Sequence, residues 1–159
     1  FSFSPAMTAI FIIYFLQRKH INLNSLFLIS FKLMSKTVIK TPDAPAPIGP
    51  YNQAILAGNM LFISGQICID PATGDLKNKD VQEETHQVMH NLKAILQQAG
   101  MTFSNVVKTT IFITDMHQFS VINEAYGKYF EGDFPARETV QVSALPKFVN
   151  VEISMIAVK

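Results

Sequence analysis

DVQEETHQVMHNLKAILQQAG, residues 80–100, is the stretch with the strongest structural signal in this 159-residue chain. Its apolar side chains recur at steps of three and four residues, the spacing that places side chains on one face of a helix. Thr85 shares that face with Val81, Val88, Met89, Leu92, Ile95, Leu96 and Ala99. Asp80 can cap the first turn, Glu83 stands at the capping-box position, and Gly100 suits the left-handed turn after a helix. The stretch therefore predicts an amphipathic helix with one face for a core.

The segment before this helix has the character of strands and turns. TPDAPAPIGPY, residues 41–51, contains four prolines, which fix φ and deny hydrogen bonds to a sheet, so it predicts an extended loop. A short strand is expected ahead of it at residues 37–40. In NQAILAGNMLFISGQI, residues 52–67, two β-rich runs flank Gly58 and Asn59, which both tolerate positive φ. This pattern indicates a hairpin with a tight turn.

The segment after the helix alternates between strand and helix signals. NVVKTTIFITD, residues 105–115, is rich in β-branched side chains and predicts a strand. A second helix fits residues 116–131, with one side formed by Phe119, Ile122, Tyr126, Tyr129 and Phe130. Strands at 137–144 and 151–158 complete the order β-β-β-α-β-α-β-β. That order predicts an α+β sandwich, a mixed β-sheet with two helices on one face.

The last predicted strand has two unlike faces. Val151, Ile153 and Met155 alternate along it with Glu152, Ser154 and Ile156. The first set suits contact with the helices, whereas the second mixes a carboxylate with apolar groups. Such a face fits a subunit interface with a polar pocket better than open water. We therefore expect a homo-oligomer.

Charge and cysteine content limit the classes of function. Residues 34–159 hold ten basic and twelve acidic side chains, a formal charge of −2 with histidines neutral. The absence of a basic surplus argues against nucleic acid as the main partner, because nothing would neutralise a phosphate backbone. Cys68 is the only cysteine in the sequence, so no disulfide forms within it, and a free thiol is typical of cytosolic proteins.

Residues 1–33 differ from the rest, with three basic residues, no acidic residue and six phenylalanines. Their apolar run, residues 5–16, is shorter than the ~20 residues that cross a bilayer, and its basic residues follow it instead of preceding it as in a signal peptide. MSK at Met34 resembles an ordinary start. We expect residues 1–33 to be an extraneous, disordered or targeting segment, residues 34–159 to form the domain, and no membrane anchor. The expected compartment is the cytoplasm, or the mitochondrion if the segment is a presequence.

Arg137, in GDFPARETVQVSALP (residues 132–146), is the only arginine after residue 33, beside nine lysines. A guanidinium fork grips a carboxylate through two hydrogen bonds, which a lysine cannot do. On a strand, Arg137 and Thr139 share one face and Glu138 points to the other. The sequence therefore makes Arg137 a candidate anchor for the carboxylate of a ligand.

Glu152 is the candidate for proton transfer, because apolar residues flank it in the sequence. A carboxylate that is partly desolvated has a raised pKa and can act on a water molecule. Two structural alternatives stay open. In the first, Glu152 is an ordinary exposed strand residue. In the second, Arg137 forms an ion pair with Glu152 or Asp133.

His86 and His90 stand four residues apart on the first predicted helix, a spacing compatible with two metal ligands. No motif in the sequence supplies the third and fourth ligands that such a site needs. We therefore expect two helix-surface histidines and no metal bound by them. Cys68 follows the hairpin in an apolar context and is predicted to serve packing.

Five motifs in this chain resemble those of one known family: APAPIGPYNQAI (44–55), FISGQI (62–67), KTTIFITDM (108–116), FPAR (134–137) and VEI (151–153). From about Met34 to Lys159 the chain is similar, in register, to the Rid family of reactive-intermediate deaminases, also called the YjgF family. Residues 1–33 have no counterpart in the family pattern.

The resemblance implies a chorismate-mutase-like subunit and a homotrimer with pockets between subunits. It implies hydrolytic deamination of reactive enamine and imine intermediates, such as 2-aminoacrylate, to 2-oxo acids and ammonia, a form of metabolite damage control. The corresponding enzyme is a 2-iminobutanoate/2-iminopropanoate deaminase, a hydrolase that needs neither a metal nor an organic cofactor.

The same resemblance implies roles for individual residues. Arg137 would hold the substrate carboxylate, Glu152 would position or activate the attacking water, and the other substrate-binding positions would be Tyr51, Ser64, Gly65, Asn123 and Thr139. The sequence departs from the family pattern at Glu138, where a small or apolar residue is common, and at Thr139, where many bacterial members have cysteine. Alternation turns Glu138 away from the pocket, and the Thr139 hydroxyl can still form a hydrogen bond.

Two other functions stay open at this point. One is an endoribonuclease or translation inhibitor, an activity attributed to relatives; the acidic main body and the lack of a histidine in the expected pocket argue against it. The other is a non-catalytic module that binds small carboxylates, which would show ligand binding without turnover.

Overall fold

The computed structural model describes residues 36–159, and the segment 1–33 with its predicted alternatives lies outside them. The described chain has six strands and two helices in the predicted order: β1 (Lys36–Ile39), β2 (Ala54–Ala57), β3 (Met60–Gln66), α3 (Val81–Gln98), β4 (Val106–Ile113), α4 (Phe119–Gly127), β5 (Ala136–Gln141) and β6 (Val151–Val158). Three short 3-10 turns are η1 (Phe103–Asn105), η2 (Met116–Gln118) and η3 (Pro146–Phe148).

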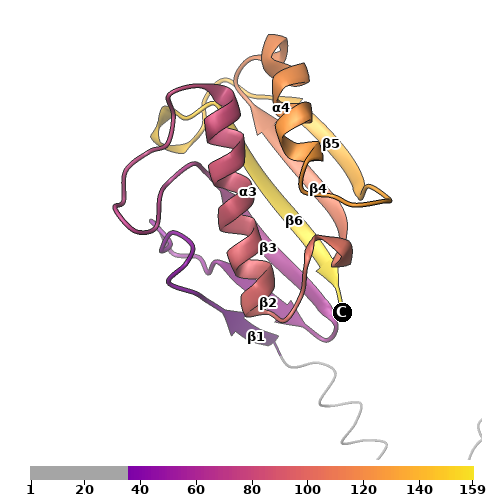
Figure 1. Ribbon diagram of the computed structural model, residues 1–159. Coiled ribbons are helices and arrows are strands. Elements are labelled where there is room, and N and C mark those ends of the chain that lie inside the picture. Colours follow the sequence, from indigo (N-terminus) through magenta and orange to yellow (C-terminus); the bar gives the residue numbers. More distant parts are fainter. Residues whose placement is uncertain (1–35) are drawn as a thin grey trace, which may run out of the picture. The chain divides into compact units, whose positions relative to one another are not determined.

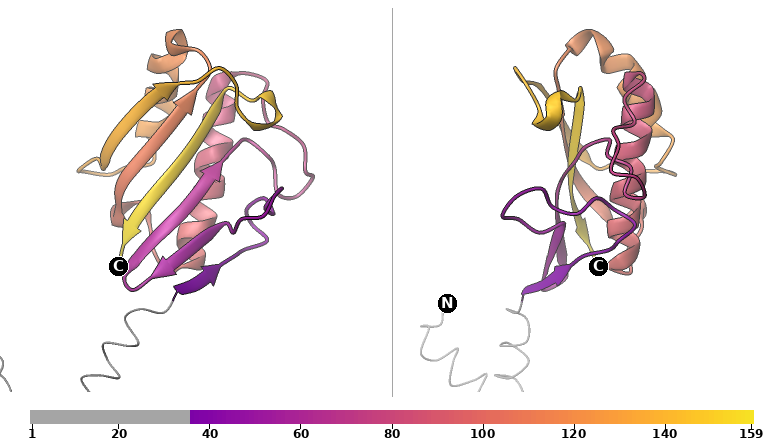
Figure 2. Two further views of the ribbon diagram at one scale, coloured as in Figure 1. Left: turned by 180° about the vertical axis from the view of Figure 1, so that it is seen from behind. Right: turned by 90° about the vertical axis from the view of Figure 1, so that its left-hand side faces the viewer.

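The six strands form one mixed sheet in the order β1-β2-β3-β6-β4-β5. β4 and β5 are parallel, and all other neighbours are antiparallel. Parallel neighbours need a crossover connection, and α4 supplies it. Both helices lie on the same face of the sheet, while the other face is bare (Figures 1 and 2). The predicted α+β sandwich is therefore confirmed.

The core lies between α3 and the middle of the sheet. Its centre consists of side chains with no exposed surface: Val88, Met89, Leu92, Ile95 and Leu96 from α3, and Val151, Ile153 and Ala157 from β6. The α3 residues, Val151 and Ile153 are those that the sequence pattern predicts; the predicted Met155 is 2% exposed, and Ala157 continues the same alternation. Cys68 is fully buried among them, and this burial, followed by the negative charge of Glu84, raises the pKa of its thiol to about 12. The predicted packing role of Cys68 is confirmed.

The ends of α3 follow the sequence closely. Asp80 Oδ1 accepts a hydrogen bond from the Glu83 amide at 2.8 Å, and Glu83 Oε2 accepts one from the Lys79 amide at 2.8 Å, one residue before the cap. Gly100 has φ +70°, the left-handed conformation that suits glycine. The predicted hairpin is also present, because Ala57 pairs with Met60 across a two-residue turn.

The second helix is shorter than the predicted span of 116–131. α4 is preceded by η2 and ends at Gly127. Beyond it the amides of Tyr129 and Phe130 bond to the carbonyls three residues back, at 3.2 and 3.3 Å. Their rings pack on Phe103, with centroids 5.6 and 5.3 Å apart, so a tertiary contact replaces the last helical turn. β5 likewise ends at Gln141 and not at residue 144.

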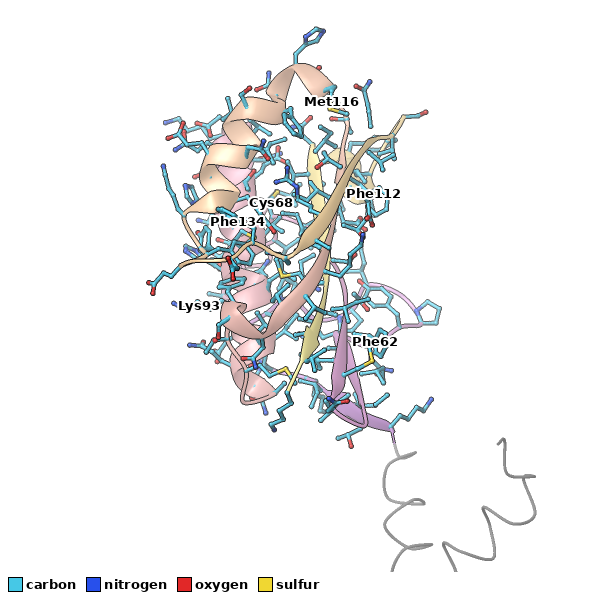
Figure 3. All side chains as sticks on the ribbon, turned by 90° about the vertical axis from the view of Figure 1, so that its right-hand side faces the viewer. Phe62, Cys68, Lys93, Phe112, Met116 and Phe134 are labelled. Atoms are coloured by element: carbon cyan, nitrogen blue, oxygen red, sulfur yellow. The ribbon has the colours of Figure 1, made fainter. Side chains whose placement is uncertain are left out.

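The bare face of the sheet is partly apolar. Phe62 and Phe112 point away from the helices, whereas Phe134 lies on the helix side (Figure 3). Phe62 and Val140 are 43% and 42% exposed. The homo-oligomer that would cover this face stays a prediction.

Candidate functional site

Arg137 stands near the start of β5, with its side chain on the helix side of the sheet. Its Nη1 donates to Asn123 Oδ1 at 2.6 Å, and its Cζ lies 5.2 Å from the ring centroid of Tyr126 and 5.7 Å from that of Phe119. Among residues 36–159, Arg137 has no carboxylate within ion-pair distance. The alternative of an ion pair with Glu152 or Asp133 is therefore wrong for the part of the chain that the structure describes.

A hollow of about 470 Å³ opens beside this guanidinium, and we call it the Arg137 cavity. Its walls are Asn123, Tyr126, Gly127, Phe134, Pro135 and Arg137. Asn123, which the family resemblance assigns to the pocket, thus lies with Arg137. The hollow combines one positive charge with aromatic walls, an environment suited to a small organic anion.

Thr139 and Glu138 follow the alternation predicted for β5. The Thr139 Oγ1 atom is buried and is the only buried side-chain oxygen or nitrogen of the described residues without a hydrogen-bond partner. Glu138 points to the bare face, where it accepts hydrogen bonds from Lys108 and Thr110. The bond from Lys108, with that from Thr110, lowers the pKa of Glu138. The Glu138 carboxylate therefore already has two hydrogen-bond donors, and it points away from Arg137.

Glu152 lies on the bare face of β6, opposite an irregularity in β3. The register between β3 and β6 shifts between Ile63 and Gln66, as in a β-bulge. This brings the backbone of Gly65 so near that a Cβ there would lie 2.7 Å from Glu152 Cδ and 2.9 Å from its Cγ. Burial raises the pKa of Glu152. Glu152 is half-buried, so the alternative of an ordinary exposed residue is wrong.

A second hollow, of about 260 Å³, opens on Glu152, and we call it the Glu152 cavity. Tyr51, Ser64 and Gly65 line it, as the resemblance implies, together with apolar side chains that include Ile48, Ile67, Ile69 and Pro146. Glu152 is the only carboxylate in its wall. Four of the predicted site residues therefore share one cavity.

Gln53 shapes this cavity without lining it, and the sequence reasoning missed it. Its buried amide donates to the carbonyls of Thr41, Ala44 and Pro45 at 2.9–3.0 Å, and its Oε1 accepts from the Thr41 amide at 2.7 Å. These bonds hold the proline-rich loop beside β3. A glutamine two residues after the loop was the available signal, but its partners lie up to twelve residues away in the chain.

Arg137 and Glu152 do not meet within one chain. They lie on opposite faces of the sheet, and β4 separates their strands. In the register, Arg137 pairs with the buried Thr109, whereas Glu152 pairs with Phe112 on the bare face. The described chain therefore carries two separate cavities lined by predicted site residues, the Arg137 cavity and the Glu152 cavity.

The two histidines of α3 contact an aromatic residue. His86 Nδ1 lies 2.9 Å from the Tyr129 hydroxyl, and the His90 ring stands edge-on to the Tyr129 ring at 5.8 Å. Burial, followed by the charge of His86, lowers the pKa of His90. No group of three potential metal ligands occurs in the described part of the chain, and no helix there is long and apolar enough to span a membrane.

Comparison with known proteins agrees with the fold and the motifs. The chain matches the protein family described as Endoribonuclease L-PSP over residues 41–159. The human 2-iminobutanoate/2-iminopropanoate deaminase is 46% identical over 124 residues, which cover 78% of this chain and 90% of that protein.

Two solved structures are similar over most of the chain. A Rid family protein from Yersinia pestis is 52% identical with a TM-score of 0.77, over 79% of this chain and 100% of that one. TdcF from E. coli, solved with bound serine, is 43% identical with a TM-score of 0.75, over 77% and 98%. This chain therefore belongs to the Endoribonuclease L-PSP family, which includes the Rid, or YjgF, proteins.

Proposed function

We propose that this protein hydrolyses reactive enamine and imine acids, such as 2-aminoacrylate, to 2-oxo acids and ammonia. The observation that carries the proposal is the pair of cavities, which we call half-sites: one holds a guanidinium that has no ion-pair partner among residues 36–159, and the other a half-buried carboxylate with a raised pKa. The name and 46% identity of the human deaminase support the same reaction.

The active pocket would form between two copies of the chain in a homotrimer. The Arg137 cavity of one copy would face the Glu152 cavity of the next, since the two cavities lie on opposite faces of one sheet. The partly apolar bare face supports such an assembly, because side chains such as Phe62 and Val140 would lose their contact with water.

Each side chain then has a chemical task. Arg137 binds the substrate carboxylate with its fork and so fixes the neighbouring carbon. A proton from solvent adds to the enamine carbon and gives the protonated imine. Glu152 takes a proton from water as the water oxygen bonds to the imine carbon, and then returns this proton to the amino group of the adduct. The C–N bond breaks and ammonia leaves, while the hydroxyl proton of the adduct passes to Glu152 and on to solvent as the carbonyl of the 2-oxo acid forms. The raised pKa of Glu152 suits a group that must both take and give a proton.

The Arg137→Ala variant tests the proposal. A coupled assay that generates 2-aminoacrylate should show no measurable hydrolysis beyond the uncatalysed rate, while the mass of the assembly stays that of the wild type. Arg137→Lys should recover little, because an ammonium cannot form the two parallel hydrogen bonds. Lys128→Ala removes an exposed cation whose one ion pair among residues 36–159 is with Glu124, and it should be silent. Full activity in Arg137→Ala would remove Arg137 from the site.

Two observations favour other functions. The family description favours cleavage of RNA, and the serine bound to TdcF favours a module that only holds small carboxylates. Neither cavity has a histidine in its wall, and the described domain has no basic surplus. RNA cleavage by a clean preparation that disappears in Glu152→Ala would support the first. Carboxylate binding without turnover of any imine would support the second.

A further inference from the structure

The guanidinium of Arg137 contacts three side chains on one face of α4. Binding of a carboxylate by Arg137 would not by itself require these contacts. Phe119, Asn123 and Tyr126 follow one another at steps of four and three residues, so they share one face of the helix. The two rings lie 5.7 and 5.2 Å from Arg137 Cζ, a distance at which a ring face attracts a cation. Between them, Asn123 accepts the Nη1 hydrogen bond at 2.6 Å.

Tyr126 is the fixed part of this arrangement. It is 2% exposed, and its hydroxyl donates to Thr109 Oγ1 at 3.2 Å. Thr109 is also the residue of β4 that pairs with Arg137 in the sheet. Burial raises the pKa of Tyr126, so its phenol stays neutral beside the cation. A rigid ring thus supports an exposed side chain that would otherwise lose rotamer freedom on binding a ligand.

The contact with α4 leaves one edge of the fork open. Within residues 36–159, the bond to Asn123 is the only hydrogen bond of the Arg137 side chain. Nη2 and Nε keep their N–H groups for the two oxygens of a carboxylate. Arg137 Cζ lies over both rings, and among the described residues neither ring takes up one of its N–H groups, so the rings hold the guanidinium without competing with the ligand.

We propose that Phe119 and Tyr126 are positioning residues that hold the guanidinium of Arg137 in the orientation in which it receives a carboxylate. This inference rests on the proposed function in one respect, the role of Arg137 as the anchor. It adds an aromatic bracket whose effect on the ligand passes through the position of Arg137.

Arginine side-chain NMR tests the bracket without any activity. The chain has two arginines, Arg18 and Arg137, so arginine labelled with ¹⁵N gives at most two Nε–H signals, and Arg137→Lys identifies the relevant one. Ring currents should displace the Arg137 Nε–H signal. Tyr126→Leu and Phe119→Leu should each move it toward the value of a free arginine, whereas Tyr126→Phe should leave it in place.

Calorimetric binding of 2-oxobutanoate gives the second readout. Tyr126→Leu should weaken binding about tenfold, the size expected for loss of a well-packed cation–ring contact. Tyr126→Phe should bind within about twofold of the wild type because the ring remains. In deamination, the loss should fall mainly on KM. In an Arg137→Ala background, Tyr126→Leu should cause no further loss, because a residue that acts through Arg137 has nothing left to position.

Tyr129→Leu is the matched control, because Tyr129 is an aromatic residue two positions after the end of α4. Its ring contacts His86, His90 and Phe103, and no contact with Arg137 occurs among the described residues. It should lower the melting temperature without moving the Arg137 signal or the affinity. An unchanged signal and affinity in both Tyr126→Leu and Phe119→Leu would overturn the bracket. So would an equal loss of binding in Tyr129→Leu. A wild type that binds 2-oxobutanoate through Arg137 but hydrolyses no imine would instead overturn the deaminase and leave the bracket standing.

Discussion

Two glutamates on the same face of one sheet have pKa values that are shifted in opposite directions. Glu138 accepts hydrogen bonds from Lys108 and Thr110, and its pKa is lowered. Glu152 lies in the wall of an apolar cavity, and burial raises its pKa. The environment therefore separates two residues of identical chemistry into one carboxylate that is held in its charged form and one whose raised pKa favours proton exchange.

Glu152 should set the acidic limb of the pH profile. Its protonated form cannot accept a proton from water, so kcat/KM should fall at low pH with a midpoint above the ordinary value for glutamate. Glu152→Gln should lower kcat by roughly 10²–10⁴-fold and remove this limb, measured by initial rates across the acidic and neutral range. An acidic limb that survives in Glu152→Gln would assign it to another group.

Thermal denaturation measured at several pH values tests the effect of the same pKa shifts on the stability of the fold. A raised folded-state pKa means that the contribution of Glu152 to stability is full below the ordinary carboxyl pKa and is lost as the pH rises through the raised value. Glu152→Gln should flatten that decline. The control Glu138→Gln should act oppositely, because a lowered pKa contributes stability above the ordinary value, and this is lost as the pH falls through the lowered one.

The irregularity in β3 leaves the space beside β6 in which the Glu152 side chain lies. A regular strand would continue the ladder with β6, whereas the shifted register places Gly65 against the carboxylate. Gly65→Ala should push Glu152 aside and lower kcat roughly 10- to 100-fold, while the melting temperature changes little, because the atoms displaced belong to a flexible side chain. Steady-state kinetics and melting curves would measure both effects. In the Glu152→Gln background the added methyl should cost little further activity.

Elements with a local cause were predictable from the sequence, and those with a tertiary cause were not. The stripe of α3 and its caps lie within 21 residues of chain, so the whole helix could be predicted. The end of α4 could not, because Tyr129 fits the same stripe but packs on Phe103 instead. The bulge beside Gly65 exists only in the register with β6. Alternation placed the side chain of Glu138 opposite Arg137, but strand order was needed to separate Arg137 from Glu152.

The two half-sites define a test of the whole assembly. If each active pocket takes Arg137 from one copy and Glu152 from another, co-expressed Arg137→Ala and Glu152→Gln chains should recover activity that neither has alone. Random mixing would give about one quarter of the interfaces an intact pair. A pocket formed within one chain would gain nothing, since every copy would still lack one group. Native mass spectrometry would verify the mixed assemblies, and their inactivity would refute the shared pocket.

The position of β6 in the sheet has a consequence for biosynthesis. It is the last strand in the sequence but lies between β3 and β4, so it joins the two halves of the sheet. In a nascent chain that has not yet reached Val151, the edges of β3 and β4 that pair with β6 in the finished sheet have no partner strand. The fold is therefore completed only after nearly all of the domain has been translated, in a step that closes contacts between residues about a hundred positions apart.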